Sequence, residues 1–207
     1  AGRTETMRAI FGADPIDSGE ILVKGKKVKI RSPRDAIREK IAFLTEDRKG
    51  QGLVLAESIQ NNLILANLRG FSRGLFLNKN KIRTQGEKRM SELSIKATGQ
   101  EERVGQLSGG NQQKVVIGKW INTDADIYIF DEATRGIDVG AKVEVYQVIN
   151  QLVKEGKCVI MVSSEMPEIL GMSDRVIVMR EGRITGEMGR ETDAFNQEDV
   201  MKAAWEV

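Results

Sequence analysis

Histidine is absent from this chain of 207 residues, and cysteine occurs once, at Cys158. Without histidine there is no Ser–His–Asp triad, no imidazole metal ligand and no histidine-based pH switch. A single cysteine excludes an intramolecular disulfide and a zinc site built from cysteines. Because Cys158 begins the apolar run 158–162, we expect it to be a small buried hydrophobic residue.

The sequence also lacks a large excess of either charge and has no long apolar run. The 32 Lys and Arg residues nearly balance the 30 Asp and Glu residues, giving a net charge of +2, so bulk attraction to nucleic acid is not indicated. No apolar run approaches the ~20 residues that span a bilayer, and no signal peptide is visible. The sequence predicts a soluble cytoplasmic chain, long enough for one core and a small subdomain.

The most informative stretch covers residues 107–138. Its first residues, Leu107, Ser108, Gly109 and Gly110, predict a helix start, with Ser108 as the N-cap. Glycines leave the first backbone N–H groups uncovered, and such a helix start binds anions such as phosphate. Taken alone, the pattern favours an ordinary capped turn.

Further along, a short apolar run at 127–130 predicts a buried strand, and it ends in Asp131 and Glu132. Open α/β sheets bind ligands at the carboxyl ends of their strands, which is where these carboxylates would lie. An apolar strand ending in Asp-Glu is a weak signal by itself.

The remaining pattern predicts a mixed α/β fold. A parallel strand–helix–strand unit is predicted over 127–162, because the helix at 140–155 carries an apolar stripe between two apolar runs. The other expected elements are a hairpin at 20–30, a short helix opened by Ser32 and Pro33, a strand at 41–45, a mobile surface loop at 46–52, only helices at 58–95, a hairpin at 175–188 and a helix at 197–205.

In this order and spacing, the motifs resemble the signature and Walker B motifs of ATP-binding cassette (ABC) ATPases. The segments that carry the resemblance are GRT at 2–4, TEDRKGQGLV at 45–54, LSGGNQQK at 107–114, FDEATRGIDVGAK at 130–142 and VSSEMPEILGMSDR at 162–175. Together they are similar to the C-terminal cassette of the double-cassette ATPase subunit of bacterial monosaccharide importers of the ribose, galactose and xylose type.

The resemblance implies a P-loop NTPase core with a mostly parallel sheet. It implies one ABC ATPase domain over residues 1–207, the second cassette of a two-cassette subunit, with a helical subdomain at 57–115. The N-terminal strands of such a domain would be missing, so we expect a rearranged sheet, an unusual exposed slot or an intermolecular strand that fills it.

ATP and Mg²⁺ are the implied cofactors. Gly2, Arg3 and Thr4 match the end of a phosphate loop, with Arg3 in place of lysine. Thr4 and Asp131 would hold Mg²⁺, and Glu132 would orient the attacking water as general base.

Three substitutions predict a weak hydrolytic site. Glu46 stands where this family usually has glutamine, and Ser164 stands where it usually has the histidine that contacts the γ-phosphate. The guanidinium of Arg3 is not equivalent to the compact ammonium of lysine.

Cassettes of this family pair head to tail, which implies a role in trans for the signature residues: Leu107, Ser108, Gly109, Gly110, Asn111 and Gln112. Gly136 and Asp138 would belong to the loop that crosses between the cassettes. The implied partners are the N-terminal cassette of the same subunit, a membrane permease on the cytoplasmic side and, indirectly, a sugar-binding protein; nucleic acid is not among them.

Two alternatives remain open at this level. A non-catalytic nucleotide-binding scaffold is supported by the three substitutions and weakened by the intact signature and by Asp131 and Glu132. A soluble ABC ATPase of DNA repair or translation is disfavoured by the balanced charge and by the loop after Glu46, where importers dock their permease.

Overall fold

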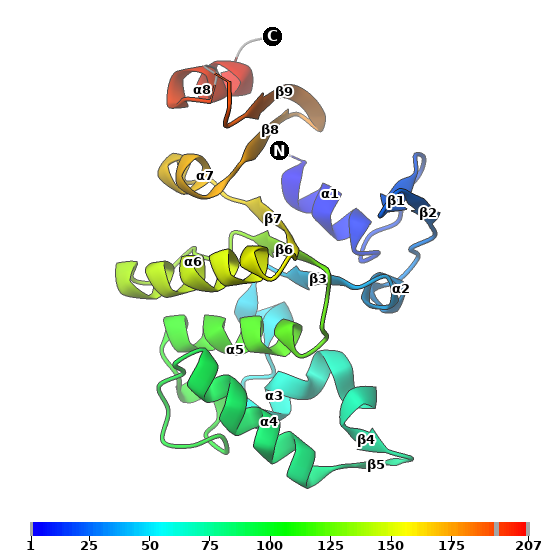
Figure 1. Ribbon diagram of the computed structural model, residues 1–207, viewed down its shortest axis with the longest axis vertical. Helices are drawn as coiled ribbons and strands as arrows, with labels where there is room; N and C mark the ends of the chain where they lie inside the picture. The colour runs from blue at the N-terminus through cyan, green and yellow to red at the C-terminus, as the bar shows by residue number, and fades with distance from the viewer. Residues whose placement is uncertain (1, 193–194, 206–207) are drawn as a thin grey trace.

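A three-stranded parallel sheet forms the centre of the computed structural model, which describes residues 2–192 and 195–205 (Figure 1). The strand order is β3 (Ile41–Leu44), β6 (Ile127–Asp131) and β7 (Cys158–Val162). Ile41 pairs with Ile127, and Ile127 pairs with Cys158. All three strands therefore end at the same edge, which confirms the predicted parallel unit and brings Asp131 beside Val162.

The expectation of a rearranged sheet is wrong for the described residues, because β3, β6 and β7 pair continuously and in parallel, with no slot between them. The central strand β6 is almost fully buried, whereas β7 lies at the edge and is only partly covered. Cys158, the first residue of β7, is exposed. The prediction that it is buried is also wrong, because an apolar run does not reveal that its strand lies at an edge.

Three helices pack against the sheet and share its hydrophobic core. They are α1 (Arg3–Ile10), α5 (Gly109–Ile121) and α6 (Val139–Lys154). Val145, Ile149 and Leu152 on α6 are buried, which confirms the predicted stripe. The sheet residues and these helix residues belong to one hydrophobic core.

A mainly helical segment lies at the lower end of the molecule in Figure 1, beside α5. It contains α3 (Ile59–Ile64), the 3₁₀ segment η2 (Leu65–Phe71) and α4 (Lys79–Glu92). A small hairpin, β4 (Ser72–Arg73) and β5 (Phe76–Leu77), interrupts it. The expectation of helices alone is wrong here, because two-residue strands are too short to show a period of two.

The other elements complete the fold, and both predicted hairpins are present. They are β1 (Ile21–Val23), β2 (Lys26–Val28), α2 (Pro33–Arg38), the π-helical turn η1 (Arg48–Gly52), η3 (Val104–Gln106), α7 (Met166–Met172), β8 (Arg175–Arg180), β9 (Arg183–Gly189) and α8 (Gln197–Trp205). A separate small core of Val176, Val178 and Val200 joins α8 to the last hairpin. No helix in the described ranges is long and apolar enough to cross a membrane.

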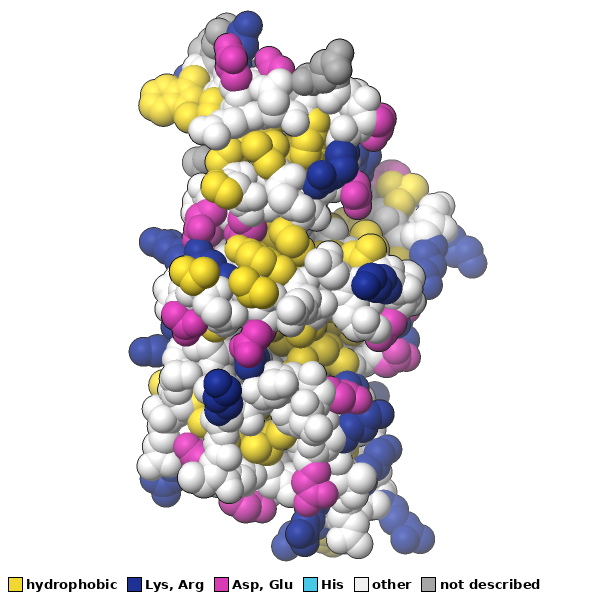
Figure 2. All heavy atoms as spheres, turned by 60° about the vertical axis from the view of Figure 1, so that its left-hand side comes forward, with side chains coloured by type: hydrophobic (Ala, Val, Ile, Leu, Met, Phe, Trp, Pro, Cys, Tyr) yellow, Lys and Arg dark blue, Asp and Glu magenta, His cyan; other side chains and the backbone are white. Residues whose placement is uncertain are grey.

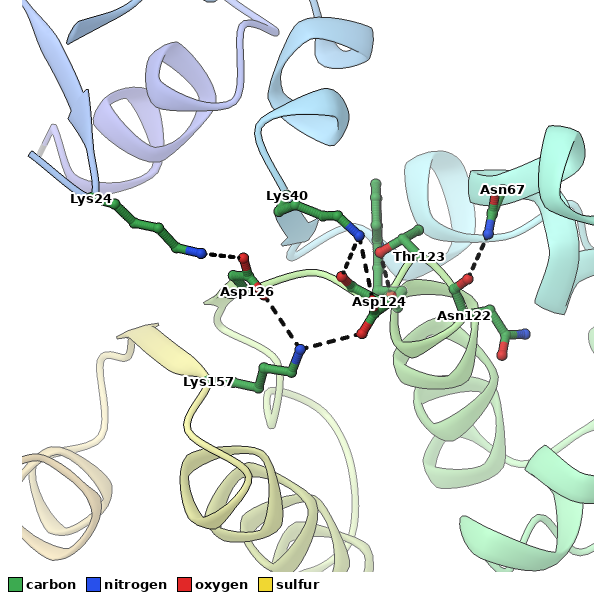
Figure 3. A network of polar contacts seen from close by, with 9 residues as sticks. Lys24, Lys40, Asn67, Asn122, Thr123, Asp124, Asp126 and Lys157 are labelled. Atoms are coloured by element: carbon green, nitrogen blue, oxygen red, sulfur yellow. Dashed lines mark hydrogen bonds and ion pairs between the residues drawn. The ribbon is translucent and has the colours of Figure 1, made fainter. Parts of the chain in front are cut away.

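An ion-pair network closes the amino edge of the sheet (Figure 3). Lys157 Nζ lies 3.3 Å from Asp124 Oδ1 and 3.5 Å from Asp126 Oδ1, and Lys24 Nζ lies 2.6 Å from Asp126 Oδ2. Hydrogen bonds from Lys157 and Lys24 lower the pKa of Asp124 and Asp126 respectively. These contacts join the residues before β6 and β7 to the β1–β2 turn, at the opposite edge from Asp131.

A buried lysine on α5 holds the loop that follows β3. Lys119 Nζ donates a hydrogen bond of 2.6 Å to the carbonyl oxygen of Gly52 and lies 5.2 Å from the ring centroid of Trp120. Asp47 fixes the other end of the π-helical turn by accepting from Gly50 N at 2.9 Å. The segment predicted as a mobile surface loop therefore contains a π-helical turn that is anchored at both ends.

Lys119 predicts a pH dependence of stability. Burial lowers its pKa from 10.5 to about 8, so the unfolded chain binds more protons between those two values. The free energy of unfolding should therefore rise with pH across that window, by up to about 3 kcal/mol. Denaturant titrations from pH 7.5 to 9.5, where tyrosine is still mostly protonated, would measure about 2 kcal/mol of this rise.

Lys119→Met should remove the rise, whereas Lys154→Met, at an exposed position on α6, should retain it. Stability that is flat with pH in the parent chain would contradict the prediction.

Candidate nucleotide site

Asp131 lies at the carboxyl end of the central strand, and its side chain is fully buried. Thr4 Oγ1, in the first turn of α1, donates a hydrogen bond of 3.1 Å to Asp131 Oδ1. Asp131 Oδ2 is buried and has no hydrogen-bond partner in the part of the chain that the structure describes. Burial raises the pKa of Asp131, and the hydrogen bond from Thr4 opposes this effect. A buried oxygen of this kind is suited to a cation or its bound water.

Glu132 turns sharply away from the strand, with a left-handed φ of 48°. Ser164 Oγ donates a hydrogen bond of 3.0 Å to its Oε2, and Arg3 Nη2 lies 3.9 Å from its Oε1. Arg3 also donates from Nη1 to the carbonyl oxygen of Ser163 at 2.6 Å. The structure thus brings together Arg3, Ser164 and Glu132, and both carboxylate oxygens of Glu132 already face a partner.

The start of α1 places these groups close to the sheet edge. Gly2 is the N-cap of α1, with a left-handed φ of 100°. A Cβ atom on Gly2 would lie 3.0 Å from the Cα of Gly182, in the turn between β8 and β9. Glycine therefore suits this position for both its backbone conformation and the limited space.

The signature residues divide into an exposed and a buried part. Ser108 is exposed and caps α5, and its Oγ receives hydrogen bonds from Asn111 N at 3.4 Å and Asn111 Nδ2 at 3.0 Å. Leu107 packs into the core, and Gln112 Nε2 donates 3.2 Å to the carbonyl oxygen of Val104. Ser108, Gly109 and Asn111 are therefore the members of the motif that a ligand can reach, whereas Leu107, Gly110 and Gln112 are buried.

The start of α6 lies directly against the start of α5. A Cβ atom on Gly110 would lie 2.6 Å from the Cβ of Ala141 and 3.7 Å from Asp138 Oδ2. Asp138 caps α6 by accepting from Ala141 N at 2.9 Å. Glycine at position 110 is thus required for the close approach of the two helices, and the signature and the loop through Gly136 and Asp138 form one surface.

The predicted nucleotide contact Glu46 is paired inside the chain. Its carboxylate accepts a hydrogen bond from Arg135 Nη1, and Arg48 Nη1 donates 3.2 Å to the carbonyl oxygen of Arg135. Arg48 Nη2 also reaches the carbonyl oxygen of Gly136 at 3.4 Å. The loop after β3 is therefore connected to the turn after β6, and the charge of Glu46 contributes to the raised pKa of Asp131.

A buried polar cluster behind the site was missed by the sequence reasoning. Glu168 on α7 accepts hydrogen bonds from Thr134 Oγ1 at 2.7 Å and from Ser163 Oγ, and all three side chains are buried. Burial, followed by the charge of Glu168 and a hydrogen bond to it, raises the pKa of Tyr146 to about 12. Sequence position could have revealed this cluster, because Ser163 directly follows β7 and Thr134 lies three residues after β6, and the carboxyl ends of neighbouring parallel strands meet at one edge.

Removal of the Glu168 carboxylate should destabilise the chain. Glu168→Ala leaves the hydroxyls of Thr134, Ser163 and Tyr146 without their acceptor, and unsatisfied buried donors of this kind cost about 3 kcal/mol in total. Chemical denaturation would measure the loss. Glu165→Ala is the matched control, because its ion pair with Lys142 is partly exposed and should contribute less than about 1 kcal/mol. Equal losses in the two variants would contradict a structural role for the cluster.

The chain matches known proteins over most of its length. The family model described as ABC transporter matches residues 1–135. The chain is 52% identical to the ribose import ATP-binding protein RbsA of Bacillus cereus over 99% of its own length and 41% of the relative. It is also 52% identical to a putative ribose/galactose/methyl galactoside import ATP-binding protein of Burkholderia lata, over 99% of its length and 40% of that relative. It therefore spans about two fifths of these proteins.

The solved structures agree on the fold. A dimeric post-hydrolysis state of the ATP-binding cassette MJ0796, bound to ADP and Pi, superposes with a TM-score of 0.77. The match covers 92% of this chain and 82% of the other, at 19% sequence identity. At this identity the match establishes the P-loop NTPase fold alone.

Proposed function

The chain belongs to the ABC transporter family, and from this premise we propose that it is an ATP-binding module that couples ATP binding and hydrolysis to monosaccharide import. The resemblance to the ATP-binding proteins of monosaccharide importers is confirmed by the relatives, whose names specify ribose or galactose import. We infer that the chain works as the second cassette of a two-cassette subunit, with 57–115 as its helical subdomain.

The observation that carries this proposal is the exposed N-terminus of α5. Ser108 and Gly109 are accessible there, whereas the rest of α5 is mostly buried. The helix start offers backbone N–H groups and the positive end of the helix dipole to a phosphate. The loop through Gly136 and Asp138 lies beside it, so a partner cassette that brings its ATP to Ser108 would contact that loop as well. This arrangement supports a signature that acts in trans.

The chain's own hydrolytic site is proposed to be weak. Glu132 is the candidate general base, but Arg3 and Ser164 both face its carboxylate. Arg3 has the charge of the usual lysine but directs one N–H group to the carbonyl oxygen of Ser163. Ser164 has no ionic charge to offer a γ-phosphate. These contacts compete with the water and the phosphate that the residues would have to bind.

The residues at the sheet edge fit a magnesium ion. Asp131 and Thr4 supply oxygen ligands, and the unpartnered Oδ2 of Asp131 can accept from a metal-bound water. Mg²⁺ is commonly held by one or two carboxylates together with substrate phosphates, so no larger carboxylate cluster is needed. When bound with ATP, the ion would neutralise charge that develops on the phosphates. Gly2 at the start of α1 and Glu46 after β3 complete the proposed nucleotide contacts.

A cavity beside the loop after β3 supports a peripheral position on the cytoplasmic face of a permease. Its volume is about 180 Å³, and Phe11, Phe43, Gln51 and Trp120 are among its lining residues. Its wall combines α1, β3, the π-helical turn and α5, so a permease segment bound there would contact both the sheet and the signature helix. The periplasmic or external sugar-binding protein would act on this module only through the permease.

A non-catalytic scaffold is the second candidate, and the two partners of Glu132 favour it. ATP turnover by the complete two-cassette subunit, measured with and without substitutions in this cassette, separates the two functions. Co-purification of the complete subunit with a membrane permease tests the link to transport. An active subunit that never associates with a permease would instead support a soluble ABC ATPase.

A further inference from the structure

The β4–β5 hairpin carries an unusual concentration of exposed apolar side chains. Leu75 is 98% exposed and Phe76 is 79% exposed, the two highest values among the large exposed hydrophobic residues of the described chain. Leu77 follows at 48%, and Leu68 in the preceding 3₁₀ segment is also exposed. These residues define what we call the hairpin tip.

The hairpin is held firmly at its base. Phe71 is buried against Ile64 and Ile82 in a small core of its own, and Asn78 N donates 2.8 Å to the carbonyl oxygen of Phe71. Gly74 takes a left-handed φ of 63° at the turn, which suits glycine. The exposure of Leu75 and Phe76 is therefore a consequence of an ordered turn that projects from the molecule at the β4–β5 label in Figure 1.

The surrounding segment has charge of one sign only. Residues 58–86 contain no Asp or Glu and five basic residues in a chain whose net charge is +2. The basic residues are Arg69, Arg73, Lys79, Lys81 and Arg83. Figure 2 shows Lys and Arg side chains at the lower end of the molecule, where this segment lies.

Three of these cations have no internal partner. Arg69, Arg73 and Lys79 are exposed and form no ion pair with any residue that the structure describes. Lys81, by contrast, donates 2.6 Å to the carbonyl oxygen of Gly70, and Arg83 pairs with Glu87 at 3.1 Å. The free cations are thus the ones next to the hairpin tip.

We propose that the hairpin tip inserts into the headgroup region of an anionic lipid bilayer. Leucine and phenylalanine at the tip supply apolar area for the headgroup boundary, and the unpaired cations around it attract anionic headgroups. The tip is convex, which suits a deformable lipid interface better than a rigid protein pocket. A second copy of this chain is disfavoured, because a symmetric contact would bring the same cations together.

This inference is independent of ATP hydrolysis and of sugar transport. Vesicles without any permease provide the test, so a failure to bind them would leave the proposed function standing. Conversely, the chain could bind lipid while the complete subunit fails to associate with a permease. The lipid inference would then stand, and the proposed link to transport would fail.

The experiment is co-sedimentation of the purified chain with two kinds of vesicle, phosphatidylcholine alone and equal parts of phosphatidylcholine and phosphatidylglycerol. We expect binding to the anionic vesicles that weakens with added salt. Leu75→Ser with Phe76→Ser should lower the affinity at least about thirtyfold through loss of apolar insertion. Arg73→Glu with Lys79→Glu should lower it about six-hundredfold, because each basic residue contributes about fivefold and each reversal replaces that attraction by a similar repulsion.

Matched controls come from the other hairpins. Ile184→Ser removes an exposed apolar residue from β9, and Lys26→Glu reverses a charge on β2. Both should leave the affinity for anionic vesicles unchanged, and all variants should keep the circular dichroism spectrum of the parent chain. Equal binding to both kinds of vesicle would overturn the proposal. Tip variants that bind anionic vesicles as well as the parent chain does would also overturn it. So would a parent chain that binds no lipid but binds an acidic protein through the hairpin tip.

Discussion

Ser108→Arg in the complete subunit is expected to abolish sugar uptake, with a reduction of at least about a hundredfold. Ser108 is exposed at the start of α5, so the arginine side chain can occupy the space that a partner's γ-phosphate would need. It also removes the hydroxyl that caps the helix. Uptake of labelled sugar by cells with matched expression of each variant is the measurement.

The structure decides which substitution is the better probe. Gly110→Asp would also set a carboxylate against the phosphate, but any Cβ atom at position 110 lies 2.6 Å from Ala141 Cβ. A loss of uptake in that variant would mix repulsion with a displaced α6. Ser108→Ala is the appropriate control for Ser108→Arg, because it removes only the cap, at about 1 kcal/mol of stability.

Glu132→Gln provides the contrasting result. If this cassette acts through its signature, the substitution affects only the chain's own hydrolytic site. There the Glu132 carboxylate already contacts Arg3 and accepts a hydrogen bond from Ser164. Uptake should then largely survive. A subunit that loses uptake with Glu132→Gln and keeps it with Ser108→Arg would reverse the proposed roles of the two motifs.

The second large effect concerns the isolated chain, which should hydrolyse ATP negligibly. Each missing preorganised contact to a transferring phosphoryl group lowers the rate by about 10²–10³. Two such contacts are altered here, because Arg3 replaces lysine and Ser164 replaces histidine, so a reduction of about 10⁴ or more relative to an intact cassette is expected. Phosphate release with Mg²⁺ and ATP is the assay, with the complete subunit as the positive control.

Magnesium-dependent turnover by the purified chain that disappears in Glu132→Gln would refute this prediction. Turnover that persists in Glu132→Gln would point to a contaminating ATPase, because that variant lacks the candidate base. The comparison therefore requires both proteins from the same preparation.

The motifs and the parallel unit were predictable because they depend on local pattern. The apolar runs of β3, β6 and β7, the stripe of α6 and the cap at Ser108 each follow from spacing within a few residues. The match to the ABC transporter family confirms the resemblance that these motifs carry. The roles of the individual site residues stay predictions.

Other features depend on which elements become neighbours, and sequence spacing does not show this. Cys158 is exposed because β7 is at the edge, and Glu46 pairs with Arg135 because β3 lies next to β6. Lys119 is buried because the end of the π-helical turn supplies a carbonyl oxygen at 2.6 Å. The Glu168 cluster collects hydroxyls from two strand ends and a helix. Each of these requires the tertiary arrangement.

The pairing of β3 with β6 has a consequence for the time at which the sheet can form during synthesis. About 80 residues, including the whole mainly helical segment, separate Leu44 from Ile127. At about 5–20 residues per second, a ribosome makes the partner strand roughly 4–16 s after β3 has been completed. All four residues of β3 are apolar and are buried in the folded chain. Throughout this interval they have no partner strand to pair with. The nascent chain therefore exposes an aggregation-prone segment early, and a chaperone has several seconds in which to bind it.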